Sequence, residues 1–72
     1  MDLDNLILEE IRYIYKTVRR IHEDLCAMGM EVEPLRIDTR MRSLRKFNLV
    51  EFKILDFPIP GRKPIAYKMK IK

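Results

Sequence analysis

The sequence predicts an α+β fold in which three helices precede a two-stranded antiparallel β-hairpin. Hydrophobic residues recur every three or four positions through the first two thirds of the chain, which is the period of amphipathic helices. After Asn48 the period changes to two, as expected for half-buried strands. With 72 residues the chain has the length of one small domain, and we expect residues 1–72 to fold as a single unit.

The first 28 residues predict two short helices. Asp4 can cap a first helix that begins at Asn5, because its carboxylate can accept hydrogen bonds from the first free amides. Thr17 is placed to begin a second helix, which extends to Met28 and is closed by Gly29. The apolar side of the first helix is expected to consist of Leu6, Ile7, Ile11 and Ile14.

An unbroken helix over residues 7–28 is the alternative prediction. No Gly or Pro interrupts this segment, and its apolar positions alternate steps of four and three, as in a coiled coil. Two helices are favoured because the two aromatic residues and the threonine at positions 13–17 are weaker helix formers. The apolar positions of the single-helix alternative are Ile7, Ile11, Ile14, Val18, Ile21, Leu25 and Met28.

A third helix is predicted from about Leu35 to Phe47. Pro34 suits its first turn, and Asn48 tolerates the left-handed backbone conformation that closes a helix. We expect its inner side to consist of Ile37, Met41 and Leu44. At about 100° per residue, the outward side chains are Arg36, Thr39, Arg42, Ser43 and Lys46, with Arg40 and Arg45 on the flanks.

Residues 49–57 and 65–71 predict the two strands of the hairpin. In the first strand Val50, Phe52 and Ile54 alternate with charged residues, so this apolar side is expected to face the core. Prolines on both sides of the intervening loop stop the strands. That loop contains Gly61, Arg62 and Lys63. We expect one core cluster to contain Ile11, Ile21, Met41, Leu44, Phe52 and Tyr67.

Charge is distributed unevenly along the chain. Residues 1–33 contain eight acidic and four basic side chains, a balance of −4, whereas residues 34–72 contain three acidic and eleven basic ones, a balance of +8. The two balances sum to the net charge of +4. Asymmetry of this kind indicates the chemistry of a binding partner, and the basic half of the chain favours a polyanion such as nucleic acid.

Catalytic and metal-binding patterns find little support. His22, Glu23 and Asp24 are consecutive on a predicted helix, so their side chains diverge instead of converging on one ion. The only two glycines are too far apart for a phosphate-binding loop. Cys26, the single cysteine, is expected to be a buried thiol. We therefore expect no enzyme activity, no cofactor and no metal.

Membrane insertion and secretion are not predicted. No apolar run approaches the roughly 20 residues that a membrane span needs. The chain starts with the acidic segment MDLDNL, where a signal peptide would be basic. The expected location is the cytoplasm.

Three segments resemble prokaryotic winged helix-turn-helix transcriptional regulators. ILEEIRYIYKTVRRIHEDL at 7–25 is similar to their first helix, short connector and second helix. RMRSLRKFNLVE at 40–51 resembles the end of the recognition helix and the entry to the wing, with Asn48 in place of the glycine of that pattern. GRKPIAYKMK at 61–70 is similar to the wing tip and the returning strand. The resemblance implies a winged helix domain that binds double-stranded DNA.

Arginine side chains on the third helix are the best candidates for reading bases, because the planar guanidinium can bind guanine bidentately. We expect Arg36 and Arg42 to contact bases, with Thr39 and Ser43 as short polar neighbours. Backbone phosphates are the expected partners of Arg40, Arg45 and Lys46. Arg62 and Lys63 on the wing are expected to contact the neighbouring backbone or the minor groove. The resemblance adds Lys16, Arg19 and Arg20, because the start of the second helix commonly faces phosphate in this architecture.

Two other classes of function are compatible with the sequence. One is a winged helix module for protein interaction in replication or transcription machinery, with the acidic half of the chain binding a protein partner. The other is a coiled-coil dimer built on residues 7–28. A DNA-binding protein of this size is also a possible homodimer, because paired half-sites require two copies.

Overall fold

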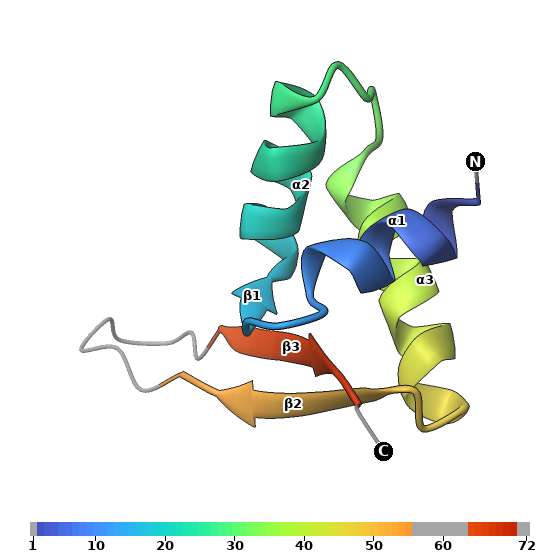
Figure 1. Cartoon of the computed structure of the whole chain (residues 1–72), viewed down its shortest axis with the longest axis vertical. Helices are drawn as coiled ribbons and strands as arrows, with labels where there is room; N and C mark the ends of the chain where they lie inside the picture. The colour runs from blue at the N-terminus through green and yellow to red at the C-terminus, as the bar shows by residue number, and fades with distance from the viewer. Residues whose placement is uncertain (1, 56–63, 71–72) are drawn as a thin grey trace.

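The computed structural model describes residues 2–55 and 64–70, and in these ranges the chain folds into three helices and a three-stranded antiparallel sheet (Figure 1). The predicted α+β class is thus confirmed. In chain order the elements are α1 (Leu3–Glu10), β1 (Lys16–Thr17), α2 (Val18–Ala27), α3 (Pro34–Lys46), β2 (Val50–Ile54) and β3 (Ile65–Met69).

Helix α1 begins and ends earlier than predicted. Asp2, not Asp4, is its N-cap, and the Asp2 carboxylate accepts a hydrogen bond from the Asp4 amide at 3.3 Å. The helix stops at Glu10 because the Ile11 carbonyl accepts a hydrogen bond from the Met69 amide at 2.8 Å, which ties the chain to the C-terminal segment. Ile14, predicted to lie on the apolar side of this helix, is 58% exposed in the loop that follows.

Two separate helices are present, and the unbroken helix over residues 7–28 is wrong. Thr17 caps α2 as predicted, its hydroxyl accepting a hydrogen bond from the Arg20 amide at 3.2 Å. The chain before it is extended, and Lys16 and Thr17 form β1, a strand that the sequence did not predict. Two residues are too few to show a period of two, and their hydrogen-bonding partners come from a distant part of the chain.

Helices α2 and α3 close as predicted. Gly29 adopts a left-handed backbone with φ 85°, and the Met30 amide donates to the Leu25 carbonyl at 3.0 Å, as in a Schellman motif. Asn48 is likewise left-handed, with φ 61°. Both turns end a helix and let the chain leave it in a new direction (Figure 1).

The sheet has the strand order β1-β3-β2, with β3 in the centre. Strands β2 and β3 are antiparallel, and Phe52 lies opposite Tyr67. The prediction that the apolar side of β2 faces the core is wrong beyond Val50, since Phe52 is 50% exposed and Ile54 is 58% exposed. This end of the hairpin projects past α1, α2 and α3, so none of these described helices covers it (Figure 1).

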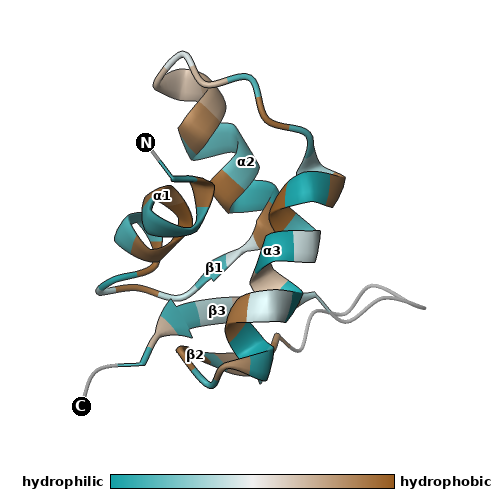
Figure 2. Cartoon of the chain, turned by 90° about the vertical axis from the view of Figure 1, so that its right-hand side faces the viewer, coloured by the Kyte–Doolittle hydropathy of each residue, from teal (hydrophilic) through white to brown (hydrophobic). Residues whose placement is uncertain are grey.

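The core lies between the three helices and the start of the hairpin. Hydrophobic and hydrophilic segments alternate along each helix, as amphipathic packing requires (Figure 2). The predicted core is confirmed except for Phe52, and the prediction of a buried Cys26 is wrong because that thiol is exposed. The buried cluster consists of Leu6, Ile7, Ile11, Ile21, Leu25, Ile37, Met41, Leu44, Val50 and Tyr67.

Within the described ranges, no helix combines the length and apolarity that crossing a membrane would need.

Candidate nucleic-acid interface

One side of α3 is buried and the opposite side carries exposed basic side chains. Ile37, Met41 and Leu44 point into the core, which turns Arg36 and Lys46 towards solvent. These two residues are ten positions apart, so they span about 15 Å along the helix axis at 1.5 Å per residue. The basic side of α3 is therefore long enough to extend across several base pairs.

The short polar residues of α3 are less available than predicted. The Thr39 hydroxyl donates a hydrogen bond to the Leu35 carbonyl at 2.9 Å, so its proton is engaged within the helix. Ser43 is half-buried. Both can still accept a hydrogen bond through an oxygen lone pair.

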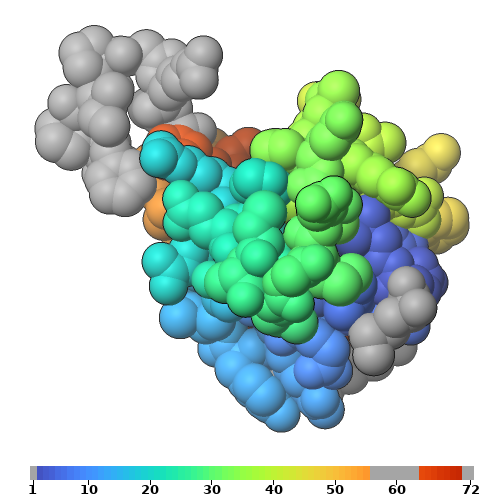
Figure 3. Space-filling model, turned by 90° about the horizontal axis from the view of Figure 1, so that it is seen from above, coloured from blue at the N-terminus to red at the C-terminus, as the bar shows by residue number. Residues whose placement is uncertain are grey.

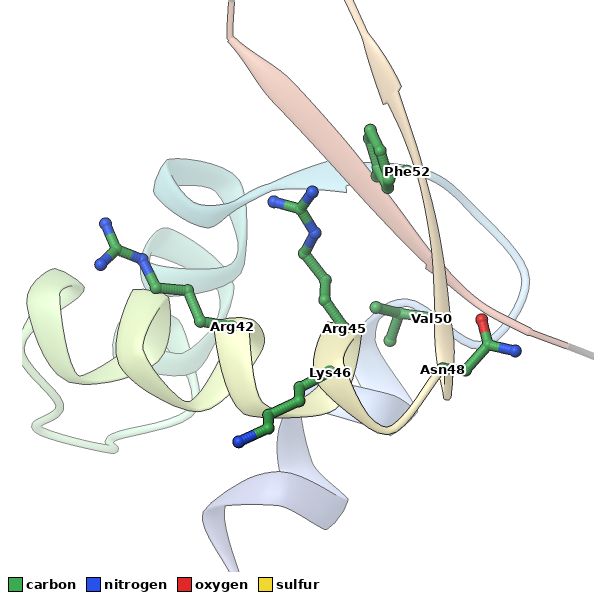
Figure 4. Close-up of a pocket in the computed structure, with 6 residues that line it drawn as sticks. All are labelled: Arg42, Arg45, Lys46, Asn48, Val50 and Phe52. Carbon is green, nitrogen blue, oxygen red and sulfur yellow. The ribbon is translucent and has the colours of Figure 1, made fainter.

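A hollow of about 440 Å³ lies between the end of α3 and β2 (Figure 4). Arg45 extends from α3 toward Phe52, and its guanidinium carbon lies 4.2 Å from the centre of the Phe52 ring and 5.9 Å from that of Tyr67. Stacking of this kind holds the guanidinium in place while its N–H groups remain able to donate. The hollow is lined by Arg42, Arg45, Lys46, Asn48, Val50 and Phe52.

Sequence reasoning missed Phe52 and Asn48 as parts of this surface. Phe52 was expected in the core, but it is half exposed and its ring packs against the Arg45 guanidinium. Asn48 was expected only to close α3, yet its side-chain oxygen also accepts a hydrogen bond from Lys70 Nζ at 3.0 Å. Only the pairing of β2 with β3 brings Lys70 beside Asn48, so no local pattern could have signalled that contact.

Arg40 forms a bidentate ion pair with another residue of the same domain, at the protein surface. Its Nε and Nη2 donate to the two carboxylate oxygens of Asp4 at 2.7 and 2.6 Å, which links α3 to α1. The hydrogen bonds from Arg40 hold the pKa of Asp4 below its ordinary value, and the same contact raises the pKa of Arg40. Arg40 is accordingly placed to fix the position of α3 on α1.

Lys16 is engaged by two carboxylates. Its ammonium lies 2.7 Å from Asp24 Oδ2 and 3.1 Å from Glu10 Oε1, and only 18% of its side chain is exposed. Desolvation acts to lower the pKa of Lys16, but the hydrogen bonds to Asp24 and Glu10 outweigh it and raise that pKa. The hydrogen bond from Lys16 also lowers the pKa of Asp24. This cluster joins α1, β1 and α2.

The other two bases predicted at the start of α2 form weaker contacts. Arg19 Nε lies 3.5 Å from Glu23 Oε1, and Arg20 Nε lies 3.5 Å from Asp24 Oδ1. Both arginines are exposed. Arg62 and Lys63, predicted on the wing, lie outside the described residues.

A second basic cluster lies on the other side of the sheet. The Nζ atoms of Lys53 and Lys68 lie 4.3 and 5.8 Å from the centre of the Tyr15 ring. The sequence predicted lysines on this side of the strands but not their aromatic partner, which comes from the loop before β1.

No group of three or more His, Cys, Asp or Glu side chains that could hold a metal ion occurs among residues 2–55 and 64–70. His22 Nε2 and Cys26 Sγ lie 3.4 Å apart, which makes them a pair without further ligands in that part of the chain.

Comparisons of the chain with protein-family models, with curated proteins and with solved structures found no match.

Proposed function

We propose that the chain is a winged helix transcriptional regulator that binds double-stranded DNA, with α3 in the major groove and the hairpin of β2 and β3 as the wing. The resemblance of residues 7–25, 40–51 and 61–70 to winged helix-turn-helix regulators supports this proposal. An α-helix is about 10–12 Å wide and the major groove of B-DNA is about 12 Å wide, so an exposed helix can enter it.

The observation that carries the proposal is that several basic side chains on α3 have no acidic partner among the described residues. Arg36, Arg45 and Lys46 form no ion pair within the described ranges, so they can bind phosphate or base edges without first losing a carboxylate partner. They contrast with Lys16 and Arg40, whose charges are already compensated. A surface that leaves several cations uncompensated favours a polyanion.

Arg42 has a competing partner that it can leave. Its Nε lies 3.2 Å from Asp38 Oδ2, one turn earlier on the same exposed helix. Exposed ion pairs of this kind contribute about 0–1 kcal/mol, whereas a bidentate contact with guanine contributes about 1–3 kcal/mol of discrimination. Arg42 can therefore leave the Asp38 carboxylate at little cost in order to contact a nucleobase.

The proposed contacts divide by role. Arg36 and Arg42 read bases, with Thr39 and Ser43 beside them. Arg45 and Lys46 bind phosphates from the hollow beside β2, and Arg19 and Arg20 can add phosphate contacts because their own ion pairs are exposed. Arg62 and Lys63 stay in the proposal on the strength of the sequence alone. Lys16 and Arg40 are assigned to holding the helices together.

A duplex-binding experiment tests this function. A preferred duplex is selected from a random pool, and its affinity is compared with that of a scrambled duplex by fluorescence anisotropy at two salt concentrations. Arg36→Ala and Arg42→Ala should reduce the preference for the selected duplex. Arg12→Ala is the matched control, because it removes one exposed positive charge from the loop between α1 and β1.

The possible outcomes separate the functions. Failure to select a preferred sequence, with salt-sensitive binding to all duplexes, would indicate a non-specific DNA-binding protein. Absence of binding to any duplex at low salt would refute the proposal and favour the protein-interaction module.

A further inference from the structure

Strand β2 forms an outer edge of the sheet, with hydrogen-bonding groups that face away from β3. The Lys70 amide donates to the Leu49 carbonyl at 2.9 Å, and the Leu55 amide donates to the Pro64 carbonyl at 2.8 Å. In an antiparallel pair, such hydrogen-bonded positions alternate with positions whose N–H and C=O groups point the other way. The outward groups of β2 are therefore those of Val50, Phe52 and Ile54.

No described element covers this edge. The order β1-β3-β2 leaves β2 at the side of the sheet, and in Figure 1 no helix or strand lies beyond it. Four of its five residues are exposed, including the apolar side chains of Phe52 and Ile54. An uncovered edge with exposed apolar side chains is a template for pairing with another strand.

The sequence of β2 is symmetric in chemical class about its central residue. Val50 and Ile54 are aliphatic residues at its ends, Glu51 and Lys53 are opposite charges next to the centre, and Phe52 is the centre. We propose that a second copy of this chain pairs antiparallel with β2, with the two-fold axis at Phe52, so that two three-stranded sheets join into one. The proposal goes beyond DNA binding and does not depend on it.

This register satisfies hydrogen bonding and charge together. Phe52 faces Phe52 of the second copy and Val50 faces Ile54, and each of these pairs uses the outward backbone groups. Glu51 then faces Lys53 of the second copy, twice per dimer. These charged pairs fall at the non-hydrogen-bonded positions, where Cα atoms are only about 4.5 Å apart and side chains interact most closely.

Neighbouring registers fail on charge. An axis at Glu51 places two glutamates opposite each other, and an axis at Lys53 places two lysines opposite each other. Like charges directly opposite destabilise a strand pair. Only the axis at Phe52 gives both Glu51 and Lys53 an oppositely charged partner.

Pairing would also cover apolar surface and extend the basic hollow. Phe52 lies on the side of the sheet that faces Arg45, so the two copies bring two stacked Arg45–Phe52 pairs to one continuous surface (Figure 4). Five residues per copy bury less area than the roughly 1,600 Å² of a standard interface. The dimer is therefore expected to dissociate on dilution.

Charge reversal tests the register. The chain has a mass of 8.7 kDa, and sedimentation over a concentration series should show this mass doubling at high concentration. In Glu51→Lys, lysines at positions 51 and 53 face each other across the axis, and in Lys53→Glu, glutamates do so. Each variant alone should have its dissociation constant raised at least about tenfold, which is about 1.4 kcal/mol.

An equimolar mixture of the two variants should dimerise again, because each lysine of one variant then faces a glutamate of the other. Misfolding of a variant could not produce this recovery, and circular dichroism checks the fold of each. Glu23→Lys is the matched control, since it makes the same charge change on the exposed side of α2 and should leave dimerisation unchanged.

Three results would overturn the proposal. A wild-type chain that stays monomeric at every concentration would leave the edge to another protein or to none. Single variants that dimerise like the wild type would place the interface elsewhere. A mixture that stays monomeric while the wild type dimerises would refute the axis at Phe52.

Discussion

The two sides of α3 contain different kinds of residue. Its inner side consists of Ile37, Met41 and Leu44, all buried in the core, while its outer side carries Arg36 and Lys46 in solvent. The inner side contributes packing that no partner molecule is needed to complete. Arg36 and Lys46 on the outer side form no ion pair within the described part of the chain. Changes on the two sides should therefore affect different measurements.

Basic side chains divide in the same way. Lys16 and Arg40 hold carboxylates of α1 and α2, so they act like core residues although they are charged. Among the described residues, Arg45 contacts the rings of Phe52 and Tyr67 and forms no ion pair, so its charge is uncompensated there. The number of basic side chains in a segment therefore overstates the positive charge available to a ligand. The contacts of each basic side chain decide whether it supports the fold or can bind a ligand.

The largest effect is expected on the inner side. Leu44→Ala removes packing from a buried position and leaves a cavity, which should cost about 2–5 kcal/mol of unfolding free energy. Thermal unfolding followed by circular dichroism measures it. An unchanged melting temperature would mean that Leu44 is not in the core and that α3 is rotated.

On the outer side, Arg36→Ala and Arg42→Ala should each lower the preference for a selected duplex by about 1–3 kcal/mol if the arginine reads a base bidentately. Their melting temperatures should stay close to that of the wild type, because both side chains are exposed. Anisotropy titrations and thermal unfolding of the same samples check the two statements. Loss of stability in both variants would remove the distinction between the two sides of α3.

Among the basic side chains, replacing Lys16 with Ala should lower the stability of the fold, but less than Leu44→Ala does. It leaves Glu10 and Asp24 beside each other without their shared cation, and we expect a loss of about 1 kcal/mol, reduced by the partial exposure of the cluster. Arg19→Ala is the control, since it removes an equal charge from an exposed ion pair within the neighbouring helix α2. Equal melting temperatures for the two variants would show that the Lys16 cluster does not support the fold.

The smallest expected effect on stability is its dependence on acidic pH. The pKa of Asp4 is lowered by the hydrogen bonds from Arg40, so this contact stabilises the fold fully above the ordinary carboxylate pKa of about 3.9. The contribution is lost as pH falls through the lowered pKa of the folded state, when the carboxylate becomes protonated. Asp4→Asn should therefore make stability depend less steeply on pH below about 4. Denaturant unfolding at pH 3 and pH 6 measures this, and identical pH dependence in both proteins would contradict it.

Arg45→Ala and Lys46→Ala sharpen the comparison on the binding side. Each should weaken all duplexes similarly and reduce the slope of log affinity against log salt by about 0.9 if it removes one phosphate contact. Lys16→Ala should leave that slope unchanged, because its ammonium is held by two carboxylates. A change of slope in Lys16→Ala would show that the cluster opens on binding DNA.

Local patterns were enough to place most of the helices and strands. Thr17 as a cap, Gly29 and Asn48 as left-handed closures and the buried side of α3 all depend on neighbours in the sequence, so the sequence predicts them correctly. The identity of the exposed arginines on α3 follows from the same helical period. These features need only short-range geometry.

Tertiary structure decided the rest, because contacts between distant residues leave no local signal. Strand β1 exists because β3 offers it hydrogen bonds, and Phe52 is exposed because the hairpin projects beyond the helices that would cover it. In space-filling form the helices pack against one another (Figure 3). This packing brings Asp4 of α1 into contact with Arg40 of α3. The sequence predicted Arg40 and Lys16 as binding residues, yet the carboxylate partner of Arg40 lies 36 positions away in the chain and those of Lys16 lie 6 and 8 positions away. The sequence by itself determined how many basic side chains α3 carries. Only the fold decided which of them have a carboxylate partner and which are left to bind a ligand.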